Sequence, residues 1–307
     1  MPELDPALIA EARAAYAEGR NVTELLRGRL GVTGNTPEIV EIAYDLQAGS
    51  YIDRIREDLP KAKAYAAELA NLLGDQVSAT SSLLDVGTGE MTTLSLILQA
   101  LPVLPSRILA CDISWSRLAV GRNFARETLG EAAPIAGFAA EIGALPLADG
   151  AVDIVTSSHA LEPNGARLEP LLAELFRVTR RRLVLFEPCW ERASPEARQR
   201  MDRLGYIRGL EESVTRLGGT VERVVPIQNV ANPLNPTFGF ILVPPSVRAT
   251  GDAASWTVPG TSLPLTRTAG IWYSSDTGLA FPELDGVPML TRSSAMLASA
   301  LEQIGKP

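Results

Sequence analysis

Cysteine and histidine are scarce in this chain of 307 residues, which has two cysteines and one histidine. Cys111 and Cys189 are too few for a disulfide framework of the kind that staples small secreted domains. Together with His159 they cannot supply the four ligands of an ordinary Cys/His zinc site. We therefore expect neither disulfides nor a structural metal.

Long apolar runs and a secretory leader are also missing. No stretch of about 18 uncharged apolar residues occurs, so the sequence predicts no membrane span. The first residues, Met1 to Asp5, lack the basic segment and apolar run of a signal peptide. We expect a cytoplasmic protein without a membrane partner.

The chain has no excess of positive charge. Lysine and arginine number 28 against 36 aspartates and glutamates, which gives a net charge of −8. This balance opposes binding to a phosphate backbone, so a nucleic-acid partner is disfavoured. Hydrophobic residues at 46% and charged residues at 21% are ordinary for a globular protein and exclude a disordered chain. At roughly 150 residues per domain, the length suggests about two domains or one core with additions.

The sequence has three regions that differ in residue pattern and composition. Residues 1–75 have apolar residues spaced at three and four, which predicts a helical N-terminal cap. Within it, Thr36 followed by Pro37 is a helix start. Residues 246–307 are rich in Thr, Ser, Gly and Pro and predict a small α+β appendage, with a hairpin from 270–274 to 278–282 and a terminal helix near 293–304.

The central region, residues 76–245, alternates short β-branched or apolar runs with helical stretches. The expected strands are 82–86, 107–111, 152–156, 182–186, 221–227 and 238–243. Strands separated by helices imply right-handed crossovers, so the fold class is α/β, a Rossmann-like, doubly wound and mainly parallel sheet.

A glycine-rich turn follows the first expected strand. Leu83 to Val86 runs directly into Gly87-Thr88-Gly89, where two glycines allow a sharp turn and the close approach of a ligand. A dinucleotide fingerprint needs a third glycine where Thr92 stands, so a nicotinamide oxidoreductase is a distant alternative. Asp85, two residues before the turn, could meet a cationic or amine-bearing ligand.

Two further segments indicate the rest of the ligand. Asp112 ends the second strand, 23 residues after Gly89, where a carboxylate can accept hydrogen bonds from the hydroxyls of a ribose. The stretch from Glu141 to Val155 offers an acid, Glu141, and an apolar neighbour, Ile142, that could hold the edge and face of an adenine.

Together these segments resemble class I S-adenosylmethionine-dependent methyltransferases over residues 76–245. The resemblance implies S-adenosyl-L-methionine as cofactor and Asp112 as the ribose acid. Glu141 departs from the usual aspartate on the adenine side by one methylene. The cofactor residues that follow from the motifs are Asp85, Gly87, Thr88, Gly89, Asp112, Ile113, Glu141, Ile142 and Ser157. A helical cap often covers the cofactor in such enzymes, for which Tyr44, Gln47 and Tyr51 are the matching candidates.

The methyl acceptor should lie beyond the fourth and fifth strands. His159 follows the fourth strand and could accept a proton near neutral pH, although packing in the loop is an equally open role. Glu187 follows the fifth strand and would face the same crevice. We predict His159 and Glu187 as catalytic candidates.

The C-terminal region has a resemblance of its own. Thr261 to Leu265 and Gly278 to Leu290 resemble the small zinc-ribbon-type activator of RNA and protein methyltransferases, without its zinc cysteines. This implies a metal-free scaffold fused to its own catalytic domain.

The leading hypothesis is methyl transfer to a small polar metabolite, such as an activated sugar or a surface-glycan precursor. Methylation of RNA or protein is the alternative enzyme, motivated by the activator-like segment. A non-catalytic protein that binds the cofactor and serves a partner is the third. The methylated atom and formation of a homo-oligomer stay open.

Overall fold

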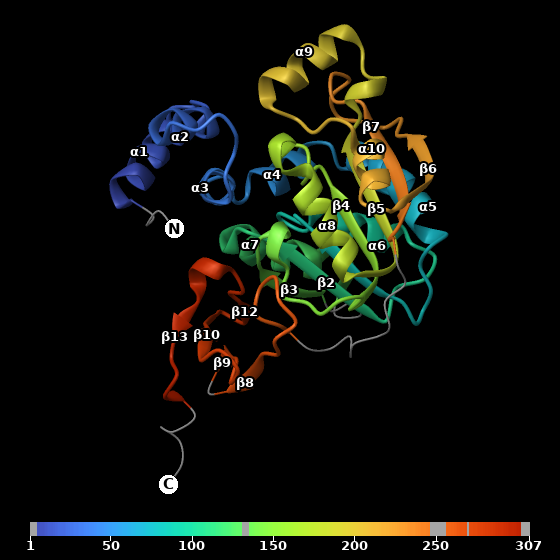
Figure 1. The fold of residues 1–307 in the computed structure, drawn as a ribbon. Coiled ribbons are helices and arrows are strands. Elements are labelled where there is room, and N and C mark those ends of the chain that lie inside the picture. The colour runs from blue at the N-terminus through green and yellow to red at the C-terminus, as the bar shows by residue number, and fades with distance from the viewer. Residues whose placement is uncertain (1–4, 131–134, 246–255, 269, 302–307) are drawn as a thin grey trace.

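A seven-stranded sheet forms the centre of the protein in this computed structural model, which describes residues 5–130, 135–245, 256–268 and 270–301. The strand order is β3-β2-β1-β4-β5-β7-β6. Strands β1 to β5 run parallel, and β7 is antiparallel to both β5 and β6, so the mainly parallel α/β sheet that the sequence predicted is confirmed (Figure 1). The strands are β1 (Ser82–Val86), β2 (Arg107–Asp112), β3 (Ile135–Ala139), β4 (Val152–Ser158), β5 (Thr179–Pro188), β6 (Thr220–Pro226) and β7 (Thr237–Val243).

Helices cover both faces of this sheet. Successive side chains of a strand point to opposite faces, and in β1 Leu83 and Leu84 are both fully buried in two different hydrophobic clusters. The cluster around Leu83 includes α5 (Leu59–Gly74), α6 (Thr92–Ala100) and α7 (Trp115–Leu129). The cluster around Leu84 includes α8 (Leu168–Val178) and α10 (Leu210–Arg216). Burial on both faces explains why the strands are apolar runs without polar alternation.

Four short helices precede the sheet, as the N-terminal pattern predicted. They are α1 (Pro6–Ala17), α2 (Val22–Leu30), α3 (Pro37–Asp45) and α4 (Ser50–Glu57). Helices α1 to α3 share a small core of their own, which includes Leu26 and Ile39. The predicted start of α3 is confirmed, because Thr36 Oγ1 accepts a hydrogen bond from Ile39 N at 3.4 Å and Pro37 occupies the first turn.

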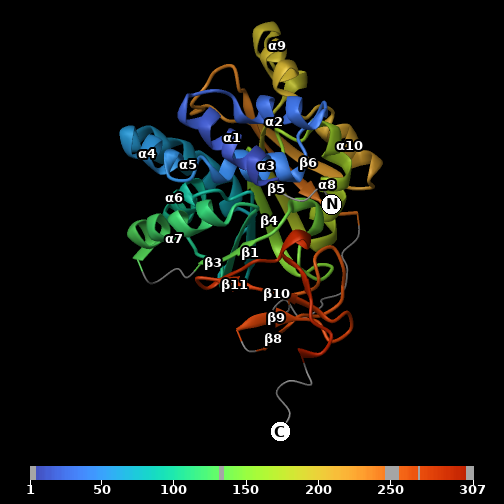
Figure 2. The ribbon, with the colours of Figure 1, turned by 90° about the vertical axis from the view of Figure 1, so that its left-hand side faces the viewer.

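Helix α3 is tied to the start of α7. Asp45 Oδ1 accepts hydrogen bonds from Ser114 Oγ at 2.7 Å and from Ser116 N at 3.2 Å. Figure 2 shows α1 to α3 grouped on the upper part of the molecule, with the C-terminal strands at the lower end. The cap is therefore attached beside the ends of β1 and β2.

The C-terminal segment lies against β3, the edge strand of the sheet. Its described residues form a small sheet of order β13-β10-β9-β8 and a two-stranded ribbon of β11 and β12. Leu290 N donates to Ala139 O of β3 at 2.7 Å, and the ring of Trp256 lies 4.6 Å from that of Phe138. The strands are β8 (Thr266–Thr268), β9 (Ile271–Tyr273), β10 (Leu279–Phe281), β11 (Glu283–Leu284), β12 (Val287–Pro288) and β13 (Met296–Leu297).

Two expectations need correction. Strand β3 is absent from the predicted set. The helix predicted near 293–304 is wrong over its described part, because Met296 and Leu297 form strand β13 and pair with Ala280 and Leu279 of β10. Residues 302–304 of that helix lie outside the described residues. The predicted hairpin is confirmed by the antiparallel pairing of β9 and β10.

Helix α9 (Pro195–Leu204) follows β5 and projects from the body of the protein (Figure 1). Within the described ranges, no helix combines the length and apolar character that crossing a bilayer requires.

Candidate functional site

A cavity of about 840 Å³, including its open mouth, lies at the carboxyl ends of β1, β2 and β4. Open α/β sheets bind ligands at this edge of the sheet. Eight predicted site residues line it: Tyr44, Tyr51, Gly87, Asp112, Ile113, Glu141, Ile142 and His159. The other six are not among its lining residues: Gln47, Asp85, Thr88, Gly89, Ser157 and Glu187.

The glycine turn is as tight as the sequence predicted. Gly87 and Gly89 have φ values of +65° and +56°, which favour glycine. A Cβ on Gly87 would lie 2.1 Å from the Cβ of Ala160, in the loop after β4. The turn and this loop therefore meet closely at the floor of the cavity, where only glycine fits.

Asp112 binds the turn and faces the cavity. Its Oδ2 accepts from Gly89 N at 2.8 Å and its Oδ1 accepts from Ser114 N at 2.9 Å. A carboxylate has about four acceptor positions, so two remain after these bonds. The buried Asp112 side chain can accept further hydrogen bonds from a ligand in the cavity.

Asp85 is buried beneath the turn and away from the cavity lining. Burial, reinforced by the charge of Asp112, raises the pKa of Asp85 to about 7. The side chain is therefore placed to support the turn from below.

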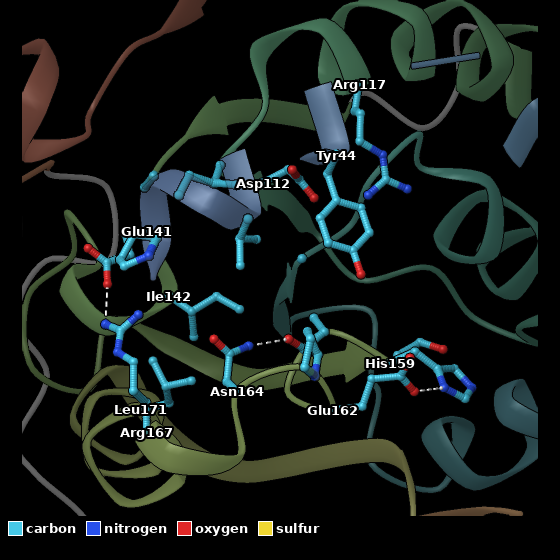
Figure 3. A pocket seen from close by; sticks show the side chains of 18 of the residues that line it. Tyr44, Asp112, Arg117, Glu141, Ile142, His159, Glu162, Asn164, Arg167 and Leu171 are labelled. Carbon is cyan, nitrogen blue, oxygen red and sulfur yellow. Dashed lines mark hydrogen bonds and ion pairs between the residues drawn. The ribbon is translucent and has the colours of Figure 1, made fainter. Parts of the chain in front are cut away.

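Tyr44 and Tyr51 enclose Arg117, which the sequence reasoning missed. The Arg117 guanidinium carbon lies 5.2 Å from the ring centre of Tyr44 and 4.5 Å from that of Tyr51. Its side chain is buried, lines the cavity, and reaches Glu90 only at 3.9 Å. Figure 3 shows Arg117 and Tyr44 side by side on one wall. A buried cation with stacked rings and a distant carboxylate can still bind an anionic group.

Glu90 holds this wall together. Its carboxylate accepts from Tyr51 N at 3.3 Å and from Ile52 N at 2.8 Å, at the start of α4. Gln47, by contrast, lies in the turn after α3 and donates from Nε2 to Ala43 O in the last turn of that helix, at 2.9 Å.

Glu141 and Ile142 form the opposite wall. Ile142 opens a short 3₁₀ helix, Ile142–Ala144, and the Glu141 carboxylate pairs with the Arg167 guanidinium. Figure 3 shows this pair at one side of the cavity and His159 at the other. Arg167, which sequence reasoning also missed, lies 26 residues from Glu141 in the chain, so local spacing carries no signal for the pairing.

His159 belongs to a hydrogen-bonded network. Its Nδ1 lies 2.7 Å from Glu162 Oε2, and its Nε2 lies 3.2 Å from Tyr65 Oη and 3.3 Å from Thr237 Oγ1. Burial lowers the pKa of His159, but the hydrogen bond and charge of Glu162 outweigh it, so the pKa is raised above 6.5. His159 also has a φ of +60°, which is unusual for a residue with a side chain. Such strain is often found at functional sites.

Glu187 supports the same loop from beneath. Its fully buried carboxylate accepts from Leu161 N at 2.9 Å, from Glu162 N at 3.1 Å and from Ser157 Oγ at 3.3 Å. Burial raises the pKa of Glu187 to about 7. The geometry gives Glu187 and Ser157 a role in positioning the loop that carries His159. Among the described residues, no group of three or more His, Cys, Asp or Glu could hold a metal ion.

Comparisons with known proteins agree with this architecture. Residues 84–186 match the family model described as a methyltransferase domain. A methyltransferase of Haloferax volcanii, solved in complex with the Trm112 methyltransferase activator, is 14% identical with a TM-score of 0.54, over 69% of this chain and 100% of that one. Magnesium protoporphyrin IX methyltransferase from Synechocystis PCC 6803 is 14% identical with a TM-score of 0.50, over 66% of this chain and 98% of that one. A search of curated proteins found no match.

Proposed function

We propose that the chain, whose residues 84–186 match a methyltransferase domain, transfers the methyl group of S-adenosyl-L-methionine to a small polar acceptor. The observation that carries this proposal is the cavity formed by the glycine turn and Asp112, at the carboxyl ends of the parallel strands. The Synechocystis neighbour was crystallised with bound S-adenosylhomocysteine, which supports the same cofactor here.

The cavity residues fit the parts of this cofactor. Asp112 has free acceptor positions for the ribose hydroxyls, and Ile142 offers an apolar surface for the adenine. Arg117 is the cation nearest the glycine turn and suits the carboxylate of the amino-acid end. Gly87 has no Cβ, so the glycine turn can lie against Ala160 at the floor of the cavity. The cofactor, when bound, supplies an electrophilic methyl carbon on a positively charged sulfur.

The chain's own residues would act mainly by alignment. A methyl transfer is an in-line displacement, so holding the acceptor at the right distance and excluding water account for much of the rate. If the acceptor atom carries a proton, a base must remove it. His159 is the candidate base, because Glu162 at Nδ1 would leave Nε2 as the acceptor nitrogen of the neutral ring.

The acceptor we favour is a small polar metabolite, with an activated sugar or surface-glycan precursor as the leading class. Glu162, Asn164 and Arg167 line the same cavity as His159 and give it hydrogen-bonding groups of both kinds. The net charge of −8 disfavours RNA.

Calorimetric titration with S-adenosylhomocysteine tests the cofactor assignment. We expect the wild-type chain to bind this ligand. In Asp112→Ala the binding free energy should weaken by about 1.5–3 kcal/mol for each charge-assisted hydrogen bond that is removed. Because Asp112 also binds Gly89 N and Ser114 N, circular dichroism must confirm that the variant is folded. A folded wild-type protein that does not bind this ligand would refute the proposal.

Methyl transfer itself is tested with labelled cofactor. Label should enter the small-molecule fraction of a cell extract and not its RNA or protein. Label in RNA or protein would favour the alternative enzyme. Tight cofactor binding without label in any fraction would favour a non-catalytic partner protein.

A further inference from the structure

A second cavity, of about 640 Å³ including its mouth, adjoins the first. Pro163, Asn164 and Arg167 line both cavities and form the wall between them. The far side of the second cavity is built from the loop between α2 and α3 and from the end of α9. The second cavity therefore adjoins the first along the loop that follows β4.

Two arginines in this cavity have no ion-pair partner among the described residues. Arg27, on α2, is half-buried and donates from Nη1 to the neutral Asn35 Oδ1 at 2.7 Å. Arg203, at the end of α9, is exposed and makes no ion pair within the described ranges. Arg167 adds a third cation, which pairs with Glu141 on the other cavity's wall.

One carboxylate also lines the cavity, and its charge is already balanced. Asp202 accepts a hydrogen bond from Trp190 Nε1 at 2.6 Å and forms an ion pair with Arg208. The cavity as a whole therefore presents an excess of positive charge, in a chain whose net charge is −8.

The walls of this cavity are held by hydrogen bonds from three parts of the chain. Asn35 Nδ2 donates to Pro163 O at 3.1 Å, and Gly165 N donates to Gly205 O at 3.2 Å. A Cβ on Gly165 would lie 2.6 Å from Gly205 O, so the two loops meet as closely as backbones can. The arginines thus line the cavity from elements that are bonded to one another without a ligand.

We propose that the second cavity binds a phosphate group of the methyl acceptor, an inference that rests on the proposed methyl transfer. A phosphate monoester carries about −1.5 to −2 charges at neutral pH, which matches two unpaired guanidinium groups better than a single carboxylate does. The guanidinium fork binds phosphate oxygens in pairs. The acceptor is then a phosphorylated small molecule whose reacting atom lies on the other side of Pro163 and Asn164.

Binding of pyrophosphate tests the cavity without knowledge of the acceptor. The protein is first saturated with S-adenosylhomocysteine and then titrated with inorganic pyrophosphate by calorimetry. We expect the wild type to bind, and Arg27→Gln and Arg203→Gln each to weaken binding about tenfold. Arg181→Gln is the matched control, because Arg181 is an exposed cation near the start of β5, at the opposite end of the sheet. Absence of wild-type binding, or equal binding by all variants, would overturn the proposal.

The charge of the labelled product provides a second test of the proposal. A small-molecule product that is retained on an anion exchanger and released by phosphatase treatment supports the proposal, whereas an uncharged product or one insensitive to phosphatase overturns it. If S-adenosylhomocysteine binds but no pool takes up label, the proposed methyl transfer fails, and pyrophosphate binding still decides what the cavity does.

Discussion

Arg117 stands apart among the residues of the site because its buried cation has only a long ion pair, in which Nε lies 3.9 Å from Glu90 Oε1. It lies between the rings of Tyr44 and Tyr51, which compensate part of the lost hydration. An anionic group of the cofactor would complete that compensation. Arg117 is thus a candidate for recognising one end of the cofactor.

We expect Arg117→Met to weaken S-adenosylhomocysteine binding by about 1.5–3 kcal/mol, the range for a hydrogen bond to a charged group. Binding of 5′-methylthioadenosine, which lacks the amino-acid end, should change little. Arg54→Met is the control, because Arg54 lies 5.3 Å from the ring centre of the same Tyr51 but does not line the cavity. Equal losses for both ligands would assign Arg117 to packing alone.

Asp85 makes stability depend on pH. Its pKa is about 7 in the folded protein and 3.8 in the unfolded chain, so folding takes up a proton between these values. The contribution of Asp85 is complete below pH 3.8 and is lost as the pH rises through about 7. The free energy of unfolding of Asp85→Asn minus that of the wild type should therefore increase from pH 5 to pH 7, by up to about 1.4 kcal/mol per pH unit. Urea unfolding at pH 5, 6 and 7 measures this, and parallel pH curves would contradict it.

At the scale of elements, the loop after β4 carries His159, the residue that we propose as the base. Glu187 holds its backbone from below, and Glu162 binds the ring of His159. On its other side, the ring nitrogen Nε2 contacts the hydroxyl groups of Tyr65 and Thr237. A loop held from both sides can present a proton acceptor in one orientation.

If His159 is the base, turnover rises with pH as its imidazole becomes neutral, with a midpoint above 6.5 because Glu162 raises the pKa. Glu162→Gln removes that charge and should move the midpoint to lower pH. His159→Asn, which tolerates a positive φ, should lower turnover roughly a hundredfold and leave S-adenosylhomocysteine affinity unchanged. Exposed Glu57→Gln is the control. An unchanged pH midpoint in Glu162→Gln would argue against His159 as the base.

Elements whose apolar residues follow a clear local pattern could be predicted from the sequence. The strands that were predicted are apolar runs bounded by turns, and the glycine turn with Asp112 follows from the end of two such runs. Strand β3 was missed because three of the five residues of Ile135–Ala139 are alanine or glycine, which are depleted in strands. The terminal helix failed because pairing of β13 with β10 overrode a helical spacing of apolar residues. Arg117 and Arg167 acquire their roles from tertiary contacts, which no local pattern encodes.

At the scale of the whole molecule, the C-terminal segment supports one wall of the cavity. Thr257 N donates to Pro146 O at 3.0 Å and Gly260 N donates to Leu145 O at 3.3 Å, just beyond Glu141 and Ile142. Trp256 packs on Phe138 of the edge strand. The segment thus packs behind the wall that we assign to the adenine.

We expect Trp256→Ala to lower the free energy of unfolding by about 3–5 kcal/mol, the range for buried aromatic truncations. It should also weaken S-adenosylhomocysteine binding, because the 3₁₀ helix Ile142–Ala144 loses its backing. Leu297→Ala is the control in the same segment, since Leu297 is 77% exposed. Denaturant unfolding and calorimetry measure the two effects. A stable variant with unaltered affinity would show that the segment is dispensable.

The bond from Leu290 to Ala139 has a consequence for how the protein is made. Chains emerge from the ribosome at about 5–20 residues per second, so roughly 10–30 s separate the synthesis of the edge strand from that of the segment that covers it. During that interval the nascent chain exposes an unpaired strand edge, a template for aggregation. A chaperone that shields this edge during translation would increase the yield of folded protein, and slow translation of the last third of the message would decrease it.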